Sequence, residues 1–288
     1  MSLPLSSFVV TLCLGVGFVS LPSPVESLPL KSISLNPNFT EAISNRQIAQ
    51  NKLRRPQQST FNPSAITQAS ANPRTAEDFL NRGLEKYEKG DLRGAIADYS
   101  QAIRLNPNYA LAYYNRGIAY ADLGEHQKAI ADYNQAIVLN PNDVDAYYNR
   151  GIVYRKLGEA QKAIADYNQA IVLNPNDADA YNNRGNAYAD LGEAQKAIAD
   201  YNQAIRLNPN YALAYYNRGT AYADLGEYQK AITDYNQAIV LNPNDADAYY
   251  NRGIVYRKLG ESQKAISNYN QAIVLNPNDP DEIGRAHV

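Results

Sequence analysis

Residues 110–143 read ALAYYNRGIAYADLGEHQKAIADYNQAIVLNPND, and this 34-residue unit recurs six times with small changes. Its most constant mark is the tripeptide Asn-Arg-Gly, which returns at 81–83, 115–117, 149–151, 183–185, 217–219 and 251–253. A period of this length is typical of a solenoid, in which each unit buries its apolar face only against its neighbours. On a longer scale, residues 102–177 and 204–279 differ at only seven positions, which indicates the duplication of a three-unit block.

Each unit is predicted to contain two amphipathic helices. Small and aromatic residues recur at i, i+4 and i+7 in both halves of the unit, as Tyr113, Gly117 and Tyr120 and then as Ala129, Tyr133 and Ala136. This spacing places each group on one face of a helix. We expect Gly124 to end the first helix in a left-handed conformation and Pro141 to end the second, since proline lacks an N–H. Asn142 or Asp143 can then cap the next helix.

This pattern resembles the tetratricopeptide repeat of bacterial type. The resemblance rests on an aromatic residue at the fourth place of the unit, followed by Gly117, Tyr120, Ala129, Tyr133, Ala136 and Pro141. It covers six tandem units, 76–109, 110–143, 144–177, 178–211, 212–245 and 246–279. It implies an all-α, right-handed superhelical solenoid of six antiparallel helix pairs, with a concave groove lined mainly by the first helix of each pair. The first unit departs from the pattern at Lys86, and every unit has arginine at a place where the family usually has leucine.

The resemblance also points to residues that would line the groove. The sixth place of the unit is asparagine without exception, at Asn81, Asn115, Asn149, Asn183, Asn217 and Asn251. A carboxamide both donates and accepts hydrogen bonds, so it can pair with both backbone groups of an extended peptide whatever the peptide's sequence. A column of them would form a ladder for a peptide, as in O-linked N-acetylglucosamine transferases. The alternative is that these asparagines only bridge adjacent repeats.

Aromatic and apolar residues flank the asparagine column and are expected to complete the peptide-binding groove. They occupy the fifth and ninth places of the unit: Tyr114, Tyr148, Tyr216, Tyr250, Ile118 and Ile152. Such a surface suits apolar and aromatic side chains of a polypeptide. The fourth unit interrupts it with Asn182 and Asn186. A carboxylate clamp of the kind found in chaperone-binding relatives is not expected, because no unit has Lys at the fifth place or Arg at the sixth.

The recurring arginine has an acidic companion in almost every unit. Arg116 is followed 16 residues later by Asp132, and only the last unit breaks this pairing, with Asn268 in place of the aspartate. We expect ion pairs in which the arginine stem also covers apolar surface. The alternative, a basic stripe for anionic ligands, is weaker because an acid accompanies nearly every arginine.

Composition argues against several classes of function. The formal net charge is −2 with no basic face, so no nucleic-acid partner is expected. The chain has a single cysteine, Cys13, and two histidines, His126 and His287, which leaves no material for a metal cluster or a nucleophile–histidine pair. Its carboxylates recur at identical unit positions, which marks them as structural. We therefore expect no cofactor, no metal and no enzyme activity.

The two ends of the chain differ from the repeats. Residues 1–27 hold a short apolar run and then a small-residue pattern, and they resemble a secretory signal peptide. Residues 28–75, rich in Ser, Asn, Gln and Pro, are predicted to be a disordered linker. We expect an exported protein, periplasmic or extracellular. The alternatives are a membrane anchor that tethers the chain, and a cytoplasmic protein if the start is misassigned.

Residues 280–288 leave the repeat pattern. The run Ile-Gly-Arg-Ala-His-Val at 283–288 matches one translation frame of a widely used sequencing adapter. We therefore expect adapter sequence fused to a truncated gene.

The function expected from these features is that of a non-catalytic scaffold for protein–protein interaction. It would bind an extended polypeptide segment in its concave groove. The alternative is the amino-terminal, substrate-recruiting arm of a larger, truncated enzyme such as a glycosyltransferase.

Overall fold

The computed structural model describes residues 53–54 and 74–277, and every regular element in these ranges is an α-helix. The helices form pairs, one pair in each 34-residue unit. They are α3 (Ala76–Glu88), α4 (Leu92–Leu105), α5 (Ala110–Asp122), α6 (His126–Leu139), α7 (Val144–Lys156), α8 (Ala160–Leu173), α9 (Ala178–Asp190), α10 (Ala194–Leu207), α11 (Ala212–Asp224), α12 (Tyr228–Leu241), α13 (Ala246–Lys258) and α14 (Ser262–Leu275). The predicted all-α solenoid is confirmed.

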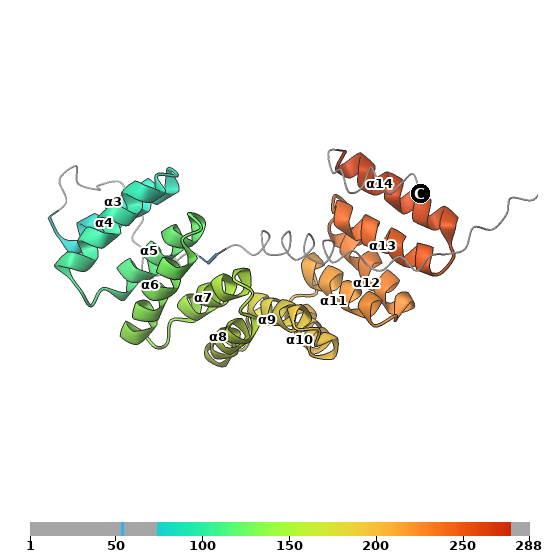
Figure 1. Ribbon diagram of the computed structural model, residues 1–288, viewed down its shortest axis with the longest axis horizontal. Coiled ribbons are helices and arrows are strands. Elements are labelled where there is room, and N and C mark those ends of the chain that lie inside the picture. Colours follow the sequence, from blue (N-terminus) through green and yellow to red (C-terminus); the bar gives the residue numbers. More distant parts are fainter. Residues whose placement is uncertain (1–52, 55–73, 278–288) are drawn as a thin grey trace, which may run out of the picture.

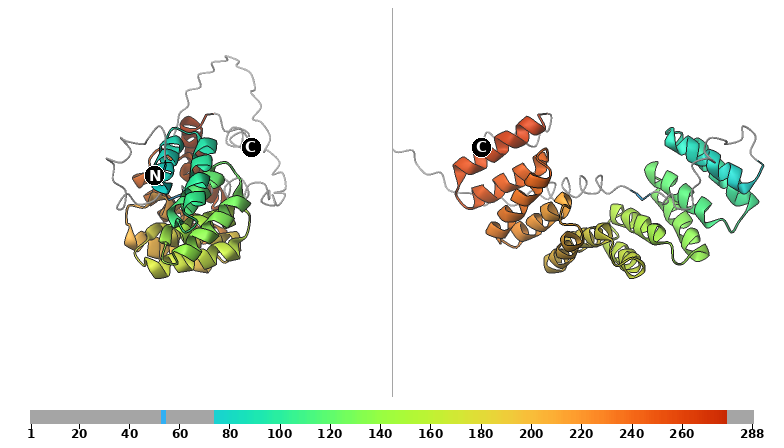
Figure 2. Two further views of the ribbon diagram at one scale, coloured as in Figure 1. Left: turned by 90° about the vertical axis from the view of Figure 1, so that its left-hand side faces the viewer. Right: turned by 180° about the vertical axis from the view of Figure 1, so that it is seen from behind.

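The pairs stack in chain order into an open arc (Figure 1). Each helix packs against the next one in the chain, and the first helices of neighbouring pairs also touch, such as α5 with α7 and α7 with α9. In the middle of the arc, α7 and α9 lie on the inner side and α8 and α10 on the outer side (Figure 1). The view along the arc shows the pairs rotating about its long axis (Figure 2). The inner side is therefore built from first helices.

The helix ends follow the predicted local chemistry. Gly124 has a φ of +76°, and the following Glu125 N–H donates to the carbonyl of Tyr120 at 2.8 Å, which closes the end of α5. Asp143, and not Asn142, caps α7, because its Oδ1 accepts from the N–H of Ala146 at 3.1 Å. The same place holds tyrosine before α5 and α11, where no side chain caps the helix.

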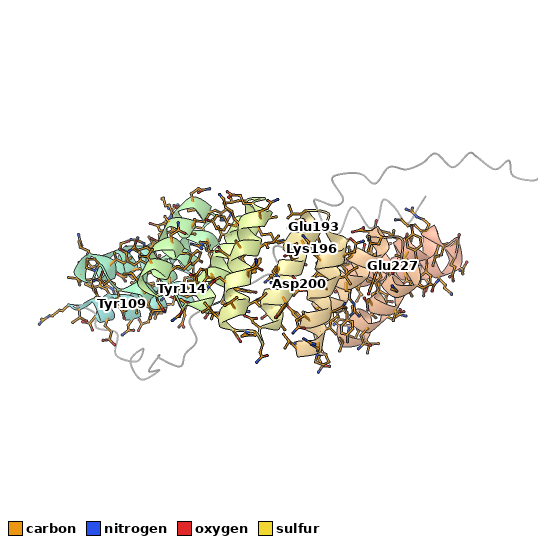
Figure 3. The ribbon with its side chains drawn as sticks, turned by 90° about the horizontal axis from the view of Figure 1, so that it is seen from below. Tyr109, Tyr114, Glu193, Lys196, Asp200 and Glu227 are labelled. Atoms are coloured by element: carbon orange, nitrogen blue, oxygen red, sulfur yellow. The ribbon has the colours of Figure 1, made fainter. Side chains whose placement is uncertain are left out.

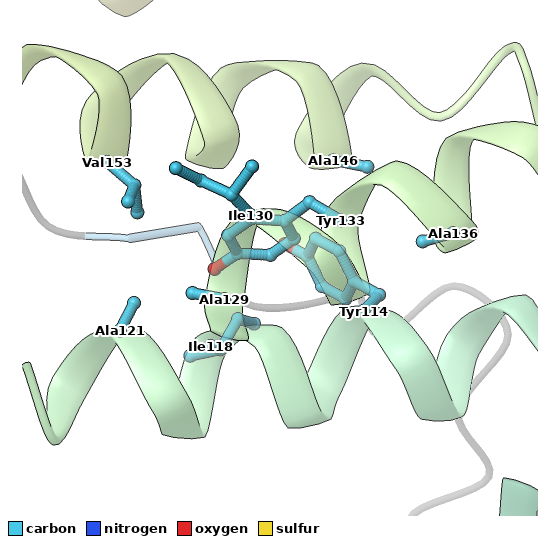
Figure 4. Packing of buried hydrophobic residues seen from close by; sticks show 9 residues of the cluster. All are labelled: Tyr114, Ile118, Ala121, Ala129, Ile130, Tyr133, Ala136, Ala146 and Val153. Atoms are coloured by element: carbon cyan, nitrogen blue, oxygen red, sulfur yellow. The ribbon is translucent and has the colours of Figure 1, made fainter. Parts of the chain in front are cut away.

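Each helix pair is held by a tyrosine packed directly on a glycine. Tyr133 of α6 is fully buried, and a Cβ atom added to Gly117 would lie only 2.8 Å from its Cε1 atom. Tyr114 meets the same ring at a centroid distance of 6.1 Å, and Ala129 and Ala136 fill the space around it (Figure 4). The glycine therefore sets how closely the two helices approach.

Ion pairs join the two helices in the first five helix pairs, as predicted. The arginine of the first helix makes two hydrogen bonds to one aspartate of the second, in Arg82–Asp98, Arg116–Asp132, Arg150–Asp166, Arg184–Asp200 and Arg218–Asp234. In the second unit both N–O distances are 2.7 Å. Burial raises the pKa of Asp132, and the bonds from Arg116 act against that rise. In the last unit Arg252 makes only one bond to the second helix of its own pair, from Nε to Oδ1 of Asn268 at 2.8 Å, and burial lowers its pKa.

The same arginines also join successive units. The second guanidinium branch of Arg150 reaches back and donates from Nη1 to Oδ1 of Asn134 in α6 at 2.6 Å. A different contact closes the joint between the third and fourth units, where the buried Arg155 donates from Nε to Asp190 at 2.6 Å. By contrast, pairs such as Glu193 and Lys196 at the start of α10 lie on the surface and add little stability (Figure 3).

Several predictions concern residues outside this described part of the chain. The signal peptide (1–27), the tail (280–288) and the linker, apart from residues 53–54 and 74–75, all fall there. Within residues 53–54 and 74–277, none of the helices combines the length and the apolar composition that a membrane span requires.

The glycine–tyrosine contact predicts the effect of Gly151→Ala. The new Cβ would lie 2.8 Å from Cε1 of the fully buried Tyr167, so the clash should outweigh the better helix propensity of alanine. We expect a loss of about 1–2 kcal/mol in the free energy of unfolding, measured with guanidinium chloride. The exposed Gln161→Ala on α8 serves as the control and should change stability by less than about 0.5 kcal/mol. Equal stability of the two variants would contradict this packing argument.

The incomplete ion pair of the last unit predicts that Asn268→Asp stabilises α14. The change restores a two-bond pair with Arg252, although it removes the bond from Asn268 to the carbonyl of Lys264. We expect a gain of about 1 kcal/mol, seen as about fivefold slower hydrogen exchange in α14. The neighbouring, exposed Ser267→Asp adds the same charge without a partner and should not slow exchange. If both variants slow exchange equally, the effect is one of net charge.

Candidate functional site

The asparagine column follows the inner helices and is mostly buried. Asn81 is partly buried, whereas Asn115, Asn149, Asn183, Asn217 and Asn251 are all buried. The flanking residues are buried as well: Tyr114, Tyr148, Tyr216, Tyr250, Ile118 and Ile152. Ile118 and Ile152 belong to the apolar core.

Most of the column joins one repeat to the next. An asparagine of one unit donates from Nδ2 to the fifth-place side chain of the unit before it, in Asn149–Tyr114 (2.9 Å), Asn183–Tyr148 (2.6 Å), Asn217–Asn182 (2.9 Å) and Asn251–Tyr216 (2.7 Å). Asn115 differs, because its Nδ2 donates to the carbonyl of Leu111 in its own helix. The bridging role that the sequence left open is therefore present in four units.

Asn149 has a second role that sets it apart. Its Oδ1 accepts from the backbone N–H of Arg54 at 2.7 Å, and its Nδ2 donates to the carbonyl of the same residue at 2.7 Å. The hydroxyl of Tyr114 also donates to that carbonyl. Both backbone groups of one residue are thus paired by groove side chains, at a distance of 95 residues along the chain. The short blue segment of Figure 1 shows this residue and Leu53 beside α7 on the inner side of the arc.

The side chain of Arg54 lies in an acidic aromatic pocket. Its guanidinium carbon lies 3.6 Å from the centroid of the Tyr148 ring. Both of its terminal nitrogens donate to the Asp177 carboxylate, from Nη1 to Oδ2 and from Nη2 to Oδ1. Asp179 and Asp145 lie further off, at 3.5 and 3.7 Å. The pocket therefore combines stacking, a two-point ion pair and two further negative charges.

The electrostatics of this pocket depend on its occupant. Burial raises the pKa of Asp145, and the positive charge of Arg54 is the main effect that acts against this rise. Burial is the largest single effect on the pKa of Arg54 and lowers it, but the bonds to Asp177 together with the nearby Tyr148, Asp177 and Asp179 raise the pKa by more. The guanidinium thus stays charged and offsets part of the cost of burying carboxylates.

Leu53 packs next to this pocket. It contacts the core cluster around Tyr114 and Tyr133 and also the cluster around Tyr148 and Tyr167. Two consecutive residues are therefore held side by side, Leu53 by the apolar core clusters and Arg54 by the acidic aromatic pocket.

Some polar side-chain atoms of α9 have no hydrogen-bond partner in the described part of the chain. They are Oδ1 of Asn183, Nδ2 of Asn182 and Nδ2 of Asn186, and all three residues are buried. In Asn149, one unit earlier, the equivalent Oδ1 atom accepts from the N–H of Arg54. Buried groups of this kind normally have a partner, so these three atoms leave hydrogen-bonding capacity unused in the interior of the fourth unit.

The sequence interpretation missed both Arg54 and its carboxylates. In the third and fourth units, one aspartate stands just before the first helix and a second one stands in its first turn (Asp143 and Asp145, Asp177 and Asp179). The second and fifth units have tyrosine and leucine at these two positions. This difference between units was a signal that could have been found. Arg54 has no such signal, because it lies outside the repeat.

The site can hold backbone amides and a cation. Residues 53–54 and 74–277 contain no group of three His, Cys, Asp or Glu residues placed to hold a metal ion.

Comparisons with known proteins agree on the type of fold. The family profile described as "TPR repeat" matches residues 83–124, 119–158, 151–192, 185–226 and 219–260, and the profile described as "Tetratricopeptide repeat" matches 246–279. No curated protein matches the chain.

Solved structures show the same architecture. The crystal structure of MamA is 31% identical with a TM-score of 0.53, over 56% of this chain and 94% of MamA. TTC0263, a thermophilic TPR protein of Thermus thermophilus, is 25% identical with a TM-score of 0.52, over 62% of this chain and 97% of that one. YrrB, described as a TPR protein with an unusual peptide-binding site, is 24% identical with a TM-score of 0.54, over 66% and 98% of the two chains. The likeness to YrrB concerns the fold alone.

The two bonds from Asn149 predict that its amide protects the backbone of Arg54. In Asn149→Ala, the hydrogen exchange of the Arg54 N–H should accelerate by about tenfold or more, because its acceptor is gone. Asn251→Ala is the matched control, since Asn251 bridges to Tyr216 as Asn149 does to Tyr114. Arg54 should exchange in this control as in the wild type. Unchanged protection in Asn149→Ala would show that the contact does not persist in solution.

Proposed function

This chain belongs to the tetratricopeptide repeat family, whose members bind proteins or peptides, and from that premise we propose that it is a non-catalytic scaffold that holds an extended polypeptide segment against α5, α7 and α9. The observation that carries the proposal is the pairing of the Asn149 amide with both backbone groups of Arg54. This contact involves no feature of the ligand's side chain. Asn149 can therefore bind any residue that has an N–H.

The surroundings of Asn149 support a polypeptide ligand over a nucleic acid. Three carboxylates, Asp145, Asp177 and Asp179, lie around the pocket and would repel a phosphate backbone. A polypeptide backbone supplies both the donor and the acceptor that the Asn149 amide requires.

The proposed function can be tested with a random-sequence peptide library displayed on phage and selected on the full chain. Enriched peptides should bind Asn149→Ala about tenfold more weakly, because two backbone hydrogen bonds are lost. Binding to the control Asn251→Ala should be unchanged, and circular dichroism should show equal helicity in all three proteins. The proposal fails if no peptide is enriched, or if enriched peptides bind Asn149→Ala as well as the wild type.

A further inference from the structure

We propose that the pocket of Tyr148, Asp145, Asp177 and Asp179 is an arginine-selective subsite, and that Leu53–Arg54 occupies it as an internal ligand until a partner displaces it. The inference rests on the proposed function and narrows its ligand class. The partner segment would be extended and would carry an apolar residue followed directly by arginine.

The preference for arginine follows from the two faces of its guanidinium. One flat face stacks on the Tyr148 ring at 3.6 Å, while the edge donates two parallel bonds to Asp177. A planar group with a fork of donors can make both contacts at once, whereas the ammonium of lysine is a point charge that can make only one well. The geometry therefore discriminates between the two cations.

The charge of the pocket excludes other side chains. Asp177 is only 5% exposed and Asp145 only 19% exposed at the side chain, so water screens them poorly. The neighbouring carboxylates of Asp143 and Asp177 raise the pKa of Asp145, after the larger effect of burial. A neutral or acidic ligand side chain would leave the carboxylates of Asp145 and Asp177 without a cation. Selectivity thus comes from repulsion between the carboxylates as well as from attraction to the cation.

Leu53 adds the second element of the motif. It lies on both core clusters that border the pocket, next to the rings of Tyr114 and Tyr148. The apolar contact and the cation contact come from consecutive residues, and Asn149 holds the backbone of the second one. A ligand with the same two residues in the same order would reproduce all three contacts.

An internal ligand lowers the apparent affinity for a partner. The contacts of Arg54 are the ones that a partner segment requires, so the two cannot be bound at once. Because the segment is covalently attached, its effective concentration is high. The apparent affinity for a partner is then the intrinsic affinity multiplied by the fraction of chains whose pocket is not occupied by Arg54.

The test uses fluorescein-labelled peptides that copy residues 50–57. All of them carry Arg55→Ala, so that Arg55 cannot enter the pocket in place of Arg54. One peptide keeps Arg54, and two others carry Arg54→Lys or Arg54→Ala. Fluorescence anisotropy measures their binding to the full-length wild type and to the full-length Arg54→Ala chain, whose pocket has lost its internal guanidinium. We expect the Arg54 peptide to bind the Arg54→Ala chain about tenfold or more tightly than the wild type. The Arg54→Lys peptide should bind at least about tenfold more weakly than the Arg54 peptide.

Variants of the pocket locate the binding. Asp177→Asn with Asp179→Asn, added to the Arg54→Ala chain, should weaken binding of the Arg54 peptide by at least about 30-fold. The cap of α9 survives this change, because asparagine caps helices as well as aspartate does. The control is Asp247→Asn, at the equivalent of Asp145 in the second three-unit block, and it should leave binding unchanged. Loss of binding in the control alone would place the ligand elsewhere and overturn the assignment.

The remaining outcomes separate the two proposals. If the three peptides bind equally and Asn149→Ala weakens them all, arginine selectivity is wrong while peptide binding stands. If neither these peptides nor any library peptide binds, both proposals fail. Equal affinity of the wild type and the Arg54→Ala chain would overturn the internal ligand. Light scattering should show the same mass for both chains, whereas a dimer that dissociates on Arg54→Ala would assign the segment to a second copy and overturn the internal arrangement.

Discussion

The contact between a glycine of one helix and a tyrosine ring of the next is the constraint on which this molecule depends. Where Gly117 meets Tyr133, the ring lies so close that not even a methyl group fits between them. The two helices of a unit therefore have one separation available to them, and the same contact recurs in every unit. Because each pair has the same geometry, the pairs stack regularly, and the arc and its inner surface follow from the stacking.

Polar side chains at the joints between units fix how each unit is aligned with the next. Asparagine amides and arginine guanidiniums cross from one unit to the next, as Asn183 does to Tyr148 and Arg150 to Asn134. Buried polar groups are costly without partners, so these bonds hold the units in one register. They also bring the amide column into line along the inner helices. The column is a structural device first, and at Asn149 the same amide also binds a backbone.

Periodicity explains what could be predicted from the sequence. The helices, the glycine at Gly117 and the pairing of Arg116 with Asp132 all recur at fixed spacing, so each copy supports the others. The peptide contact does not recur. Arg54 lies outside the repeat and reaches Asn149 across 95 residues, a distance that no local pattern encodes. The tyrosines expected to line the groove, such as Tyr114 and Tyr148, are buried, and the sequence pattern alone did not indicate how deeply they lie.

The way in which Asn149 holds Arg54 has a consequence for the neighbouring sequence. A residue bound by this amide must have an N–H, and proline has none. Pro56 stands two residues after Arg54. If the segment slid along the groove by two positions, Pro56 would meet Asn149 and leave its Oδ1 without a donor. The proline thus disfavours this two-residue shift, because it would leave the amide oxygen of Asn149 unpaired.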